Sequence, residues 1–188
     1  VSGILKAHAS NLRKISGDLR LLNLLGEISL PALQAGSSIM PGKVNPVALE
    51  AAIQAGIKVV SNDLIITEAC SCASLQINEF MPLLAHALLE SLDILNDTDL
   101  MLAPHICAIS ADEKKCRWYF DRSPAIITAL LPQIGYHKAQ ELLVEFKGSG
   151  QDDLRAFLSA KLGEKAVKNA FSPHNLIALG HKPDRKST

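Results

Sequence analysis

The chain has few aromatic residues, few cysteines and no surplus of charge of either sign, and each shortage excludes a class of protein. Aromatic residues make up 4% of the sequence, and 19 basic residues balance 19 acidic ones. Without a positive surplus, neither a nucleic acid nor a membrane surface is an expected partner. The four cysteines form no Cys-x-x-Cys pair, and a chain of this size does not need disulfides. We therefore expect buried, reduced thiols.

Long uninterrupted apolar runs are also lacking. The longest are broken by Glu50, Lys58 and Asp63, so no segment is expected to span a bilayer. Residues 1–9 show no basic leader followed by an apolar block of the signal-peptide type. These features together predict a cytoplasmic protein.

What the chain has in plenty is leucine, alanine and isoleucine at helical spacing. Residues 3–22, 46–72 and 79–102 repeat apolar side chains every three or four positions, which predicts three long helices. After residue 104 the pattern changes to short helical segments punctuated by glycine, and no strand-like alternation occurs. The sequence predicts an all-α protein, with part of a central helical-bundle domain over residues 1–104 and a small C-terminal helical domain over residues 105–188.

The predicted helix at residues 46–72 is apolar on every face. Asn45 is a typical N-cap, Pro46 suits the first helical position, and Glu50 lies near the positive end of the helix dipole. A helix that is apolar all round is buried on all sides. At ~1.5 Å per residue it would be roughly 40 Å long, too long for this chain to bury alone. We expect another subunit or further chain to cover it.

The loop before this helix, ALQAGSSIMPGKVNP at residues 32–46, does not match several familiar sites. In a phosphate-binding P-loop four residues separate the glycine from Gly-Lys, and Ser or Thr follows. Here five residues separate Gly36 from Gly42, and Val44 follows Lys43. The Gly-x-Ser-x-Gly pattern of a hydrolase nucleophile is also absent. The six histidines lack metal-ligand spacing, so we expect no metal and no other cofactor.

The loop residues can instead form an anion site. The backbone N–H groups of residues 36–38 can form a nest, Lys43 adds a positive charge, and Asn45 offers an amide at a helix N-terminus. This set suits a carboxylate, especially one whose charge grows during a reaction. Gly36 and Gly42 would let the loop close and exclude water. From the residues alone, an ordinary surface loop with helix capping is equally compatible.

The unbroken stretch GSSIMPGKVNP, residues 36–46, resembles the signature of the aspartase/fumarase superfamily of lyases. LGEISLPALQ before it, and residues 75–95 and 123–139 after it, are also similar to members of this superfamily. Lys-Val-Asn-Pro distinguishes the chain from argininosuccinate and adenylosuccinate lyases. ESLDIL and SADEKKCRWYFDRS look more like aspartate ammonia-lyase than class II fumarate hydratase, while IGYHKA suits either.

The resemblance implies elimination of a group β to a carboxylate, with release of fumarate through a doubly charged aci-carboxylate. Ser37 would be the general base that removes the proton beside the carboxylate, and Lys43 would pair with a substrate carboxylate. Ser38 and Asn45 would hold the loop or the substrate. Each also has a structural alternative: the serines as turn residues, the lysine as a solvated side chain and the asparagine as a helix cap.

Supporting roles are implied for three more residues. Glu50 corresponds to the glutamate that, in the family, supports a histidine from elsewhere in the complete protein; stabilisation of the first helical turn is its alternative. Gly36 and Gly42 would give the loop its freedom. The partner would be a small dicarboxylate such as aspartate or fumarate, bound in active sites shared within a homotetramer.

The chain also departs from the family pattern. Members are longer and begin with segments that supply threonine, serine, asparagine and histidine groups of the pocket. RLLNLLGEI lacks the Ser-Gly-Pro-Arg-like insert usual near residue 23. The resemblance therefore implies a C-terminal portion of a lyase, with an incomplete active site in this chain alone. A non-catalytic fragment with an assembly or structural role stays open as an alternative.

Overall fold

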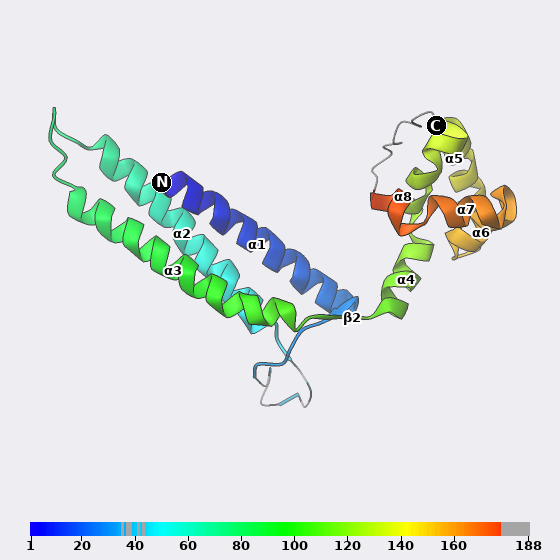
Figure 1. Ribbon diagram of the computed structural model, residues 1–188, viewed down its shortest axis with the longest axis horizontal. Helices are drawn as coiled ribbons and strands as arrows, with labels where there is room; N and C mark the ends of the chain where they lie inside the picture. The colour runs from blue at the N-terminus through cyan, green and yellow to red at the C-terminus, as the bar shows by residue number, and fades with distance from the viewer. Residues whose placement is uncertain (35, 37–38, 41, 43, 178–188) are drawn as a thin grey trace, which may run out of the picture. The chain divides into compact units, whose positions relative to one another are not determined.

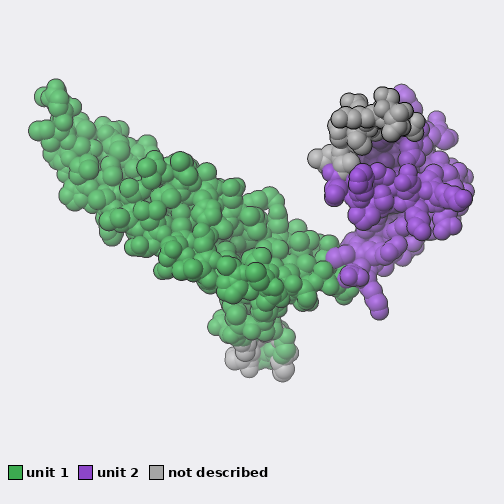
Figure 2. All heavy atoms as spheres, viewed as in Figure 1, with its two compact units in different colours: residues 1–112 green, residues 113–188 purple. Residues whose placement is uncertain are grey.

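A computed structural model describes residues 1–34, 36, 39–40, 42 and 44–177. The chain divides into two compact units, residues 1–112 and residues 113–188 (Figure 2). The predicted all-α class is confirmed, because helices dominate both units. Within the described residues, no helix combines the length and apolar character that crossing a membrane would require.

The first unit is built on three long helices (Figure 1). They confirm the prediction made from the three stretches of apolar residues at helical spacing. They are α1 (Ser2–Leu25), α2 (Val47–Ser71) and α3 (Met81–Cys107). Helix α2 packs along both others. Two short strands, β1 (Ile28–Ser29) and β2 (Ser110–Ala111), pair antiparallel at one end of the bundle. The sequence did not predict this pairing, since two residues are too few to show alternation.

Helices α1 and α2 approach closely at Gly56. A Cβ atom at this position would lie 2.4 Å from Cγ of Arg13 and 3.0 Å from the carbonyl oxygen of Ala9. Any side chain there would therefore require the Arg13 side chain to move and the α1 backbone at Ala9 to give way slightly. Small apolar clusters on both sides of this point hold the helices together, among them Ala9 with Val59 and Leu95.

Helix α2 buries one stripe and exposes other apolar side chains. Leu49 and Ala52 are fully buried, and together with Leu102 of α3 they form a cluster near the start of α2. On other faces, however, Ile57 is 51% and Leu64 is 61% exposed. Such side chains gain free energy when they leave water. Their cover by another subunit stays a prediction.

Helix α3 ends later than the sequence predicted. It continues through Pro104 to Cys107, although a proline lacks the N–H donor and its ring crowds the carbonyl four residues earlier; only three helical residues follow it. The first unit accordingly extends to residue 112, whereas the sequence analysis placed the domain change after residue 104.

The expectation of buried thiols was wrong. Cys70, Cys72 and Cys107 are exposed and Cys116 is partly exposed, and none of these four residues forms a disulfide. Three of them lie at or beside helix ends, where little of the chain covers them.

The second unit is a set of short helices, as the sequence predicted. In chain order they are α4 (Glu113–Arg122), the 3₁₀ helix η1 (Pro124–Leu130), α5 (Leu131–Gly148), α6 (Leu154–Leu162), α7 (Glu164–Ala170) and α8 (Pro173–Ile177). Side-chain caps begin three of them: Ser123 accepts a hydrogen bond from the N–H of Ala125, Asp153 accepts one from that of Ala156, and Ser172 accepts one from that of Asn175. Leu130, Leu154 and Leu158 are fully buried in a single apolar core.

Candidate active site

The signature loop lies between β1 and α2, and the structure describes only part of it. Of the predicted site residues, Gly36, Gly42, Asn45 and Glu50 are described, whereas Ser37, Ser38 and Lys43 lie outside the described residues. The predicted general base and the predicted carboxylate-binding lysine are therefore not tested here, and both roles stay predictions.

Asn45 connects the two ends of the loop. Its side-chain Nδ2 donates a hydrogen bond of 3.4 Å to the carbonyl oxygen of Gly36. The interpretation of Asn45 as the N-cap of α2 was wrong: Pro46 occupies that position, and no side chain caps the helix. The reason is local, because the backbone oxygen of Asn45 instead accepts a hydrogen bond of 2.9 Å from the N–H of Val47, two residues on. The Asn45 amide is thus used to close the loop.

Gly42 has a backbone conformation that favours glycine. Its φ is +81°, in the left-handed region, although nothing would obstruct a Cβ atom there. The requirement is therefore conformational rather than spatial. A residue with a side chain would therefore be strained at position 42.

Glu50 lies in the first turn of α2 and pairs with an arginine of α1. Nη2 of Arg20 lies 3.3 Å from Oε1 of Glu50, and both side chains are partly exposed. Its place in the first turn is the one that the helix-dipole alternative requires, and both roles of Glu50 stay predictions. Sequence reasoning missed Arg20, because it precedes Glu50 by 30 residues and no local pattern joins them.

An apolar cluster lies at the start of α2, directly after the loop in the sequence. Beneath the start of α2, the cluster of Leu49, Ala52 and Leu102 is extended by Leu30, which follows β1.

Nearby along α3, His105 is only 6% exposed, and neither ring nitrogen has a hydrogen-bond partner in the described structure. No sequence signal distinguished this histidine from the other five. Across the described residues, no group of three or more His, Cys, Asp or Glu side chains is placed to hold a metal ion.

Comparisons with known proteins agree with the signature. A family model described as "Lyase" matches residues 1–61. Aspartate ammonia-lyase of Pseudomonas canavaninivorans is 40% identical over 184 residues, which are 94% of this chain and 39% of that protein. Class II fumarate hydratase of Pseudomonas putida is 38% identical over 189 residues, covering 97% of this chain and 41% of that protein.

A solved structure shares the fold as well as the sequence. The fumarate lyase:delta crystallin of Brucella melitensis, in native form, superposes with a TM-score of 0.75 at 40% identity, over 90% of this chain and 39% of that one. The chain thus spans about two fifths of the length of the relatives it matches. By sequence and by fold, it belongs to the aspartase/fumarase superfamily of lyases.

Proposed function

We propose that this chain is part of an enzyme that eliminates ammonia from L-aspartate to give fumarate through an aci-carboxylate intermediate. The observation that carries the proposal is the intact signature at residues 36–46, within a chain that is similar to aspartate ammonia-lyases along 94% of its length. Since the chain spans about two fifths of such relatives, we infer that it is a C-terminal portion and that further residues complete the pocket.

In this proposal Ser37 removes the proton beside the substrate carboxylate. A serine hydroxyl is a weak base until it ionises, so backbone N–H groups and a nearby cation must stabilise its oxyanion. Lys43 pairs with a carboxylate of the substrate, and Ser38 and Asn45 hold the loop or the substrate. The Asn45–Gly36 hydrogen bond links two described residues of the signature, and the left-handed conformation of Gly42 accounts for a glycine at that position.

Glu50 has a supporting role in the same proposal. Arg20 holds its carboxylate at the start of α2, beside the loop, where it can hydrogen-bond to a histidine from elsewhere in the complete protein. Among the described residues, no histidine makes an observed hydrogen bond to Glu50.

We also infer a homotetramer with shared active sites. The exposed apolar side chains of α2, Ile57 and Leu64 among them, support it, because a bundle of such helices from several subunits would bury them. A stable, well-folded monomer of the complete protein in sedimentation experiments would contradict this assembly.

Class II fumarate hydratase is the second candidate, favoured by a relative of that name at 38% identity over 97% of the chain. The two reactions differ in the leaving group, water instead of ammonia. A non-catalytic structural role is a third candidate, because one solved relative carries the name delta crystallin as well as fumarate lyase.

One assay separates the three candidates. The complete protein is supplied with L-aspartate or L-malate, and fumarate is followed by its absorbance. Fumarate from aspartate alone supports the ammonia-lyase, fumarate from malate alone supports the hydratase, and none from either favours the structural role. Mass spectrometry of the protein from its source checks the inferred greater length.

A further inference from the structure

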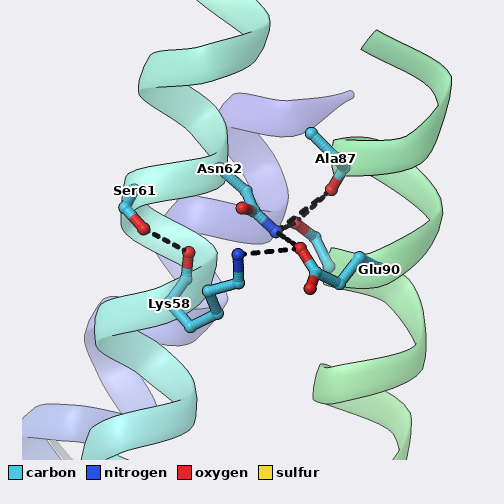
Figure 3. A network of polar contacts seen from close by, with 6 residues as sticks. Lys58, Ser61, Asn62, Ala87 and Glu90 are labelled. Atoms are coloured by element: carbon cyan, nitrogen blue, oxygen red, sulfur yellow. Dashed lines mark hydrogen bonds and ion pairs between the residues drawn. The ribbon is translucent and has the colours of Figure 1, made fainter. Parts of the chain in front are cut away.

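A fully buried asparagine interrupts the apolar contact between α2 and α3. Along this contact the facing residues are otherwise mostly apolar, with Val59 packed against Leu95 in a small cluster. Asn62 follows one turn later on α2 and is 0% exposed. It faces Ala87 of α3 (Figure 3) and lies within hydrogen-bond distance of Ser91 on the same helix.

Asn62 belongs to a polar network that joins the two helices. Its Nδ2 lies 2.8 Å from Oε2 of Glu90, 3.1 Å from Oγ of Ser91 and 3.3 Å from the carbonyl oxygen of Ala87. Oγ of Ser91 donates to that same carbonyl at 2.7 Å, so it can only accept from Asn62. Nζ of Lys58 lies 3.0 Å from Oε2 of Glu90 (Figure 3). The ammonium group of Lys58 and the amide group of Asn62 thus both lie within hydrogen-bond distance of the same carboxylate oxygen of Glu90.

The network is costly as well as specific. Oδ1 of Asn62 is buried without a hydrogen-bond partner in the described structure. An unsatisfied buried acceptor destabilises a fold, and an apolar residue of similar size would avoid that cost. A single buried asparagine in a helix–helix contact is known to select one register at the expense of stability.

The apolar residues around the network select the register only weakly. Because α2 is apolar on most faces, a slide of about one turn, ~5.4 Å, would replace one apolar layer by a similar one. Only the observed register brings the Asn62 amide to Glu90 and Ser91. We propose that Lys58, Asn62, Glu90 and Ser91 form a clasp that fixes the register of α2 against α3, with the ionised Glu90 carboxylate as its essential member.

The charge state of Glu90 is consistent with this role. The hydrogen bonds from Asn62 and Lys58 hold its pKa below the ordinary value of 4.5. The charged groups that face it are Lys58 from α2 and His86 from α3 itself, which also lowers the pKa when protonated. A lowered carboxyl pKa means that the clasp is fully formed above pH 4.5 and is lost as the pH falls through the lowered pKa.

The clasp also determines where the signature loop lies. Helix α2 begins at Val47, directly after the loop, and runs antiparallel to α3. A change of register would carry Asn45 and Glu50 along the end of α3. The inference does not depend on which reaction the protein catalyses.

Disulfide trapping in the full chain tests the register, after the four native cysteines are replaced by serine. One variant carries Val59→Cys and Leu95→Cys, a pair that matches the observed register. The other carries Val59→Cys and Thr98→Cys, a pair that meets only after a slip of about one turn. The ratio of their oxidation rates at pH 7 measures the preference for the observed register.

We expect Asn62→Leu to lower this ratio at least about tenfold, as the loss of a hydrogen bond to a charged group implies. Glu90→Gln, which keeps the shape of the side chain, should lower it in the same direction. The matched control is Asp63→Asn, which removes the 3.0 Å contact with Lys6 between α1 and α2 and should leave the ratio unchanged.

If Asn62→Leu prevents folding, Glu90→Gln decides alone. The proposal would be overturned if every folded clasp variant gave the same ratio of oxidation rates as the two cysteine pairs without a clasp substitution. So would an equal loss in Asp63→Asn, because the register would then depend on general stability.

Discussion

The two units of the chain bury their apolar residues in different ways. In the second unit, short helices enclose one continuous core around Leu130, Leu154 and Leu158. In the first unit, long helices share small separate clusters and leave residues such as Ile57 and Leu64 exposed. The second unit therefore has a core of its own, whereas the first has the features of one part of a larger bundle.

Side-chain contacts connect helices in both units. In the second unit Arg155 of α6 lies 3.0 Å from Asp121 of α4, while Ser123 and Asp153 accept hydrogen bonds from backbone groups of their own helices. In the first unit Arg20–Glu50 and Asn62–Glu90 connect different helices. The candidate active site belongs to the first unit, so chemistry and assembly are expected to depend on the same helices.

The largest expected effect is a loss of turnover caused by substitutions in the signature loop of the first unit. In the complete enzyme, Ser37→Ala should lower kcat at least about a hundredfold with little rise in KM, since general-base catalysis contributes typically ~10²–10⁴-fold and acts in the transition state. Lys43→Ala should also raise KM, because it removes a partner of the bound carboxylate. Steady-state kinetics with aspartate measures both.

Ser38→Ala is the neighbouring control for Ser37. Near-normal turnover in Ser37→Ala together with loss in Ser38→Ala would move the base by one residue. If neither variant changed turnover, the loop would be only a structural connection and the proposed function would fail.

The next effect tests whether the second unit has its own core. Leu158→Ala should destabilise it by about 2–5 kcal/mol, the range for truncating a buried leucine. Chemical unfolding followed by the fluorescence of Trp118, which lies in α4, measures this change. Val144→Ala on the exposed surface of α5 is the control and should have little effect. An equal loss in both variants would argue against a localised core.

A smaller effect on folding, but a clear effect on assembly, is expected for Leu64→Asp. Because Leu64 is exposed within the chain, we expect a change of at most about 0.5 kcal/mol in its intrinsic stability. A charge on a face that other subunits cover should dissociate the assembly. Analytical ultracentrifugation of the complete protein detects this; an unchanged mass for the variant would exclude that face from the interface.

The smallest effect is a difference in acid sensitivity. Hydrogen bonds from Lys6 and Ser2 lower the pKa of Asp63 below 3.8, and those from Asn62 and Lys58 lower that of Glu90 below 4.5. Both carboxylates stabilise the first unit above these values, and the contribution is lost as the pH falls through the lowered pKa values. Thermal unfolding between pH 7 and pH 3 should therefore show a weaker acid dependence in the double variant Asp63→Asn, Glu90→Gln.

The helices could be predicted because their signals are local. Apolar residues at three- and four-residue spacing located α1, α2 and α3. The signature at residues 36–46 is a continuous stretch, so it too could be recognised without knowing the fold. Helix ends were less certain, as Pro104 inside α3 illustrates.

The sequence by itself thus determined the helical class, the order of the elements and the position of the signature loop, all of which depend on neighbours a few residues apart. Tertiary structure alone decided the rest: that Arg20 meets Glu50, that Asn62 meets Glu90 across 28 residues, and that Asn45 bonds to Gly36 instead of capping α2. The physical reason is that such partners depend on how helices are docked and in which register, and a periodic apolar sequence is compatible with several registers.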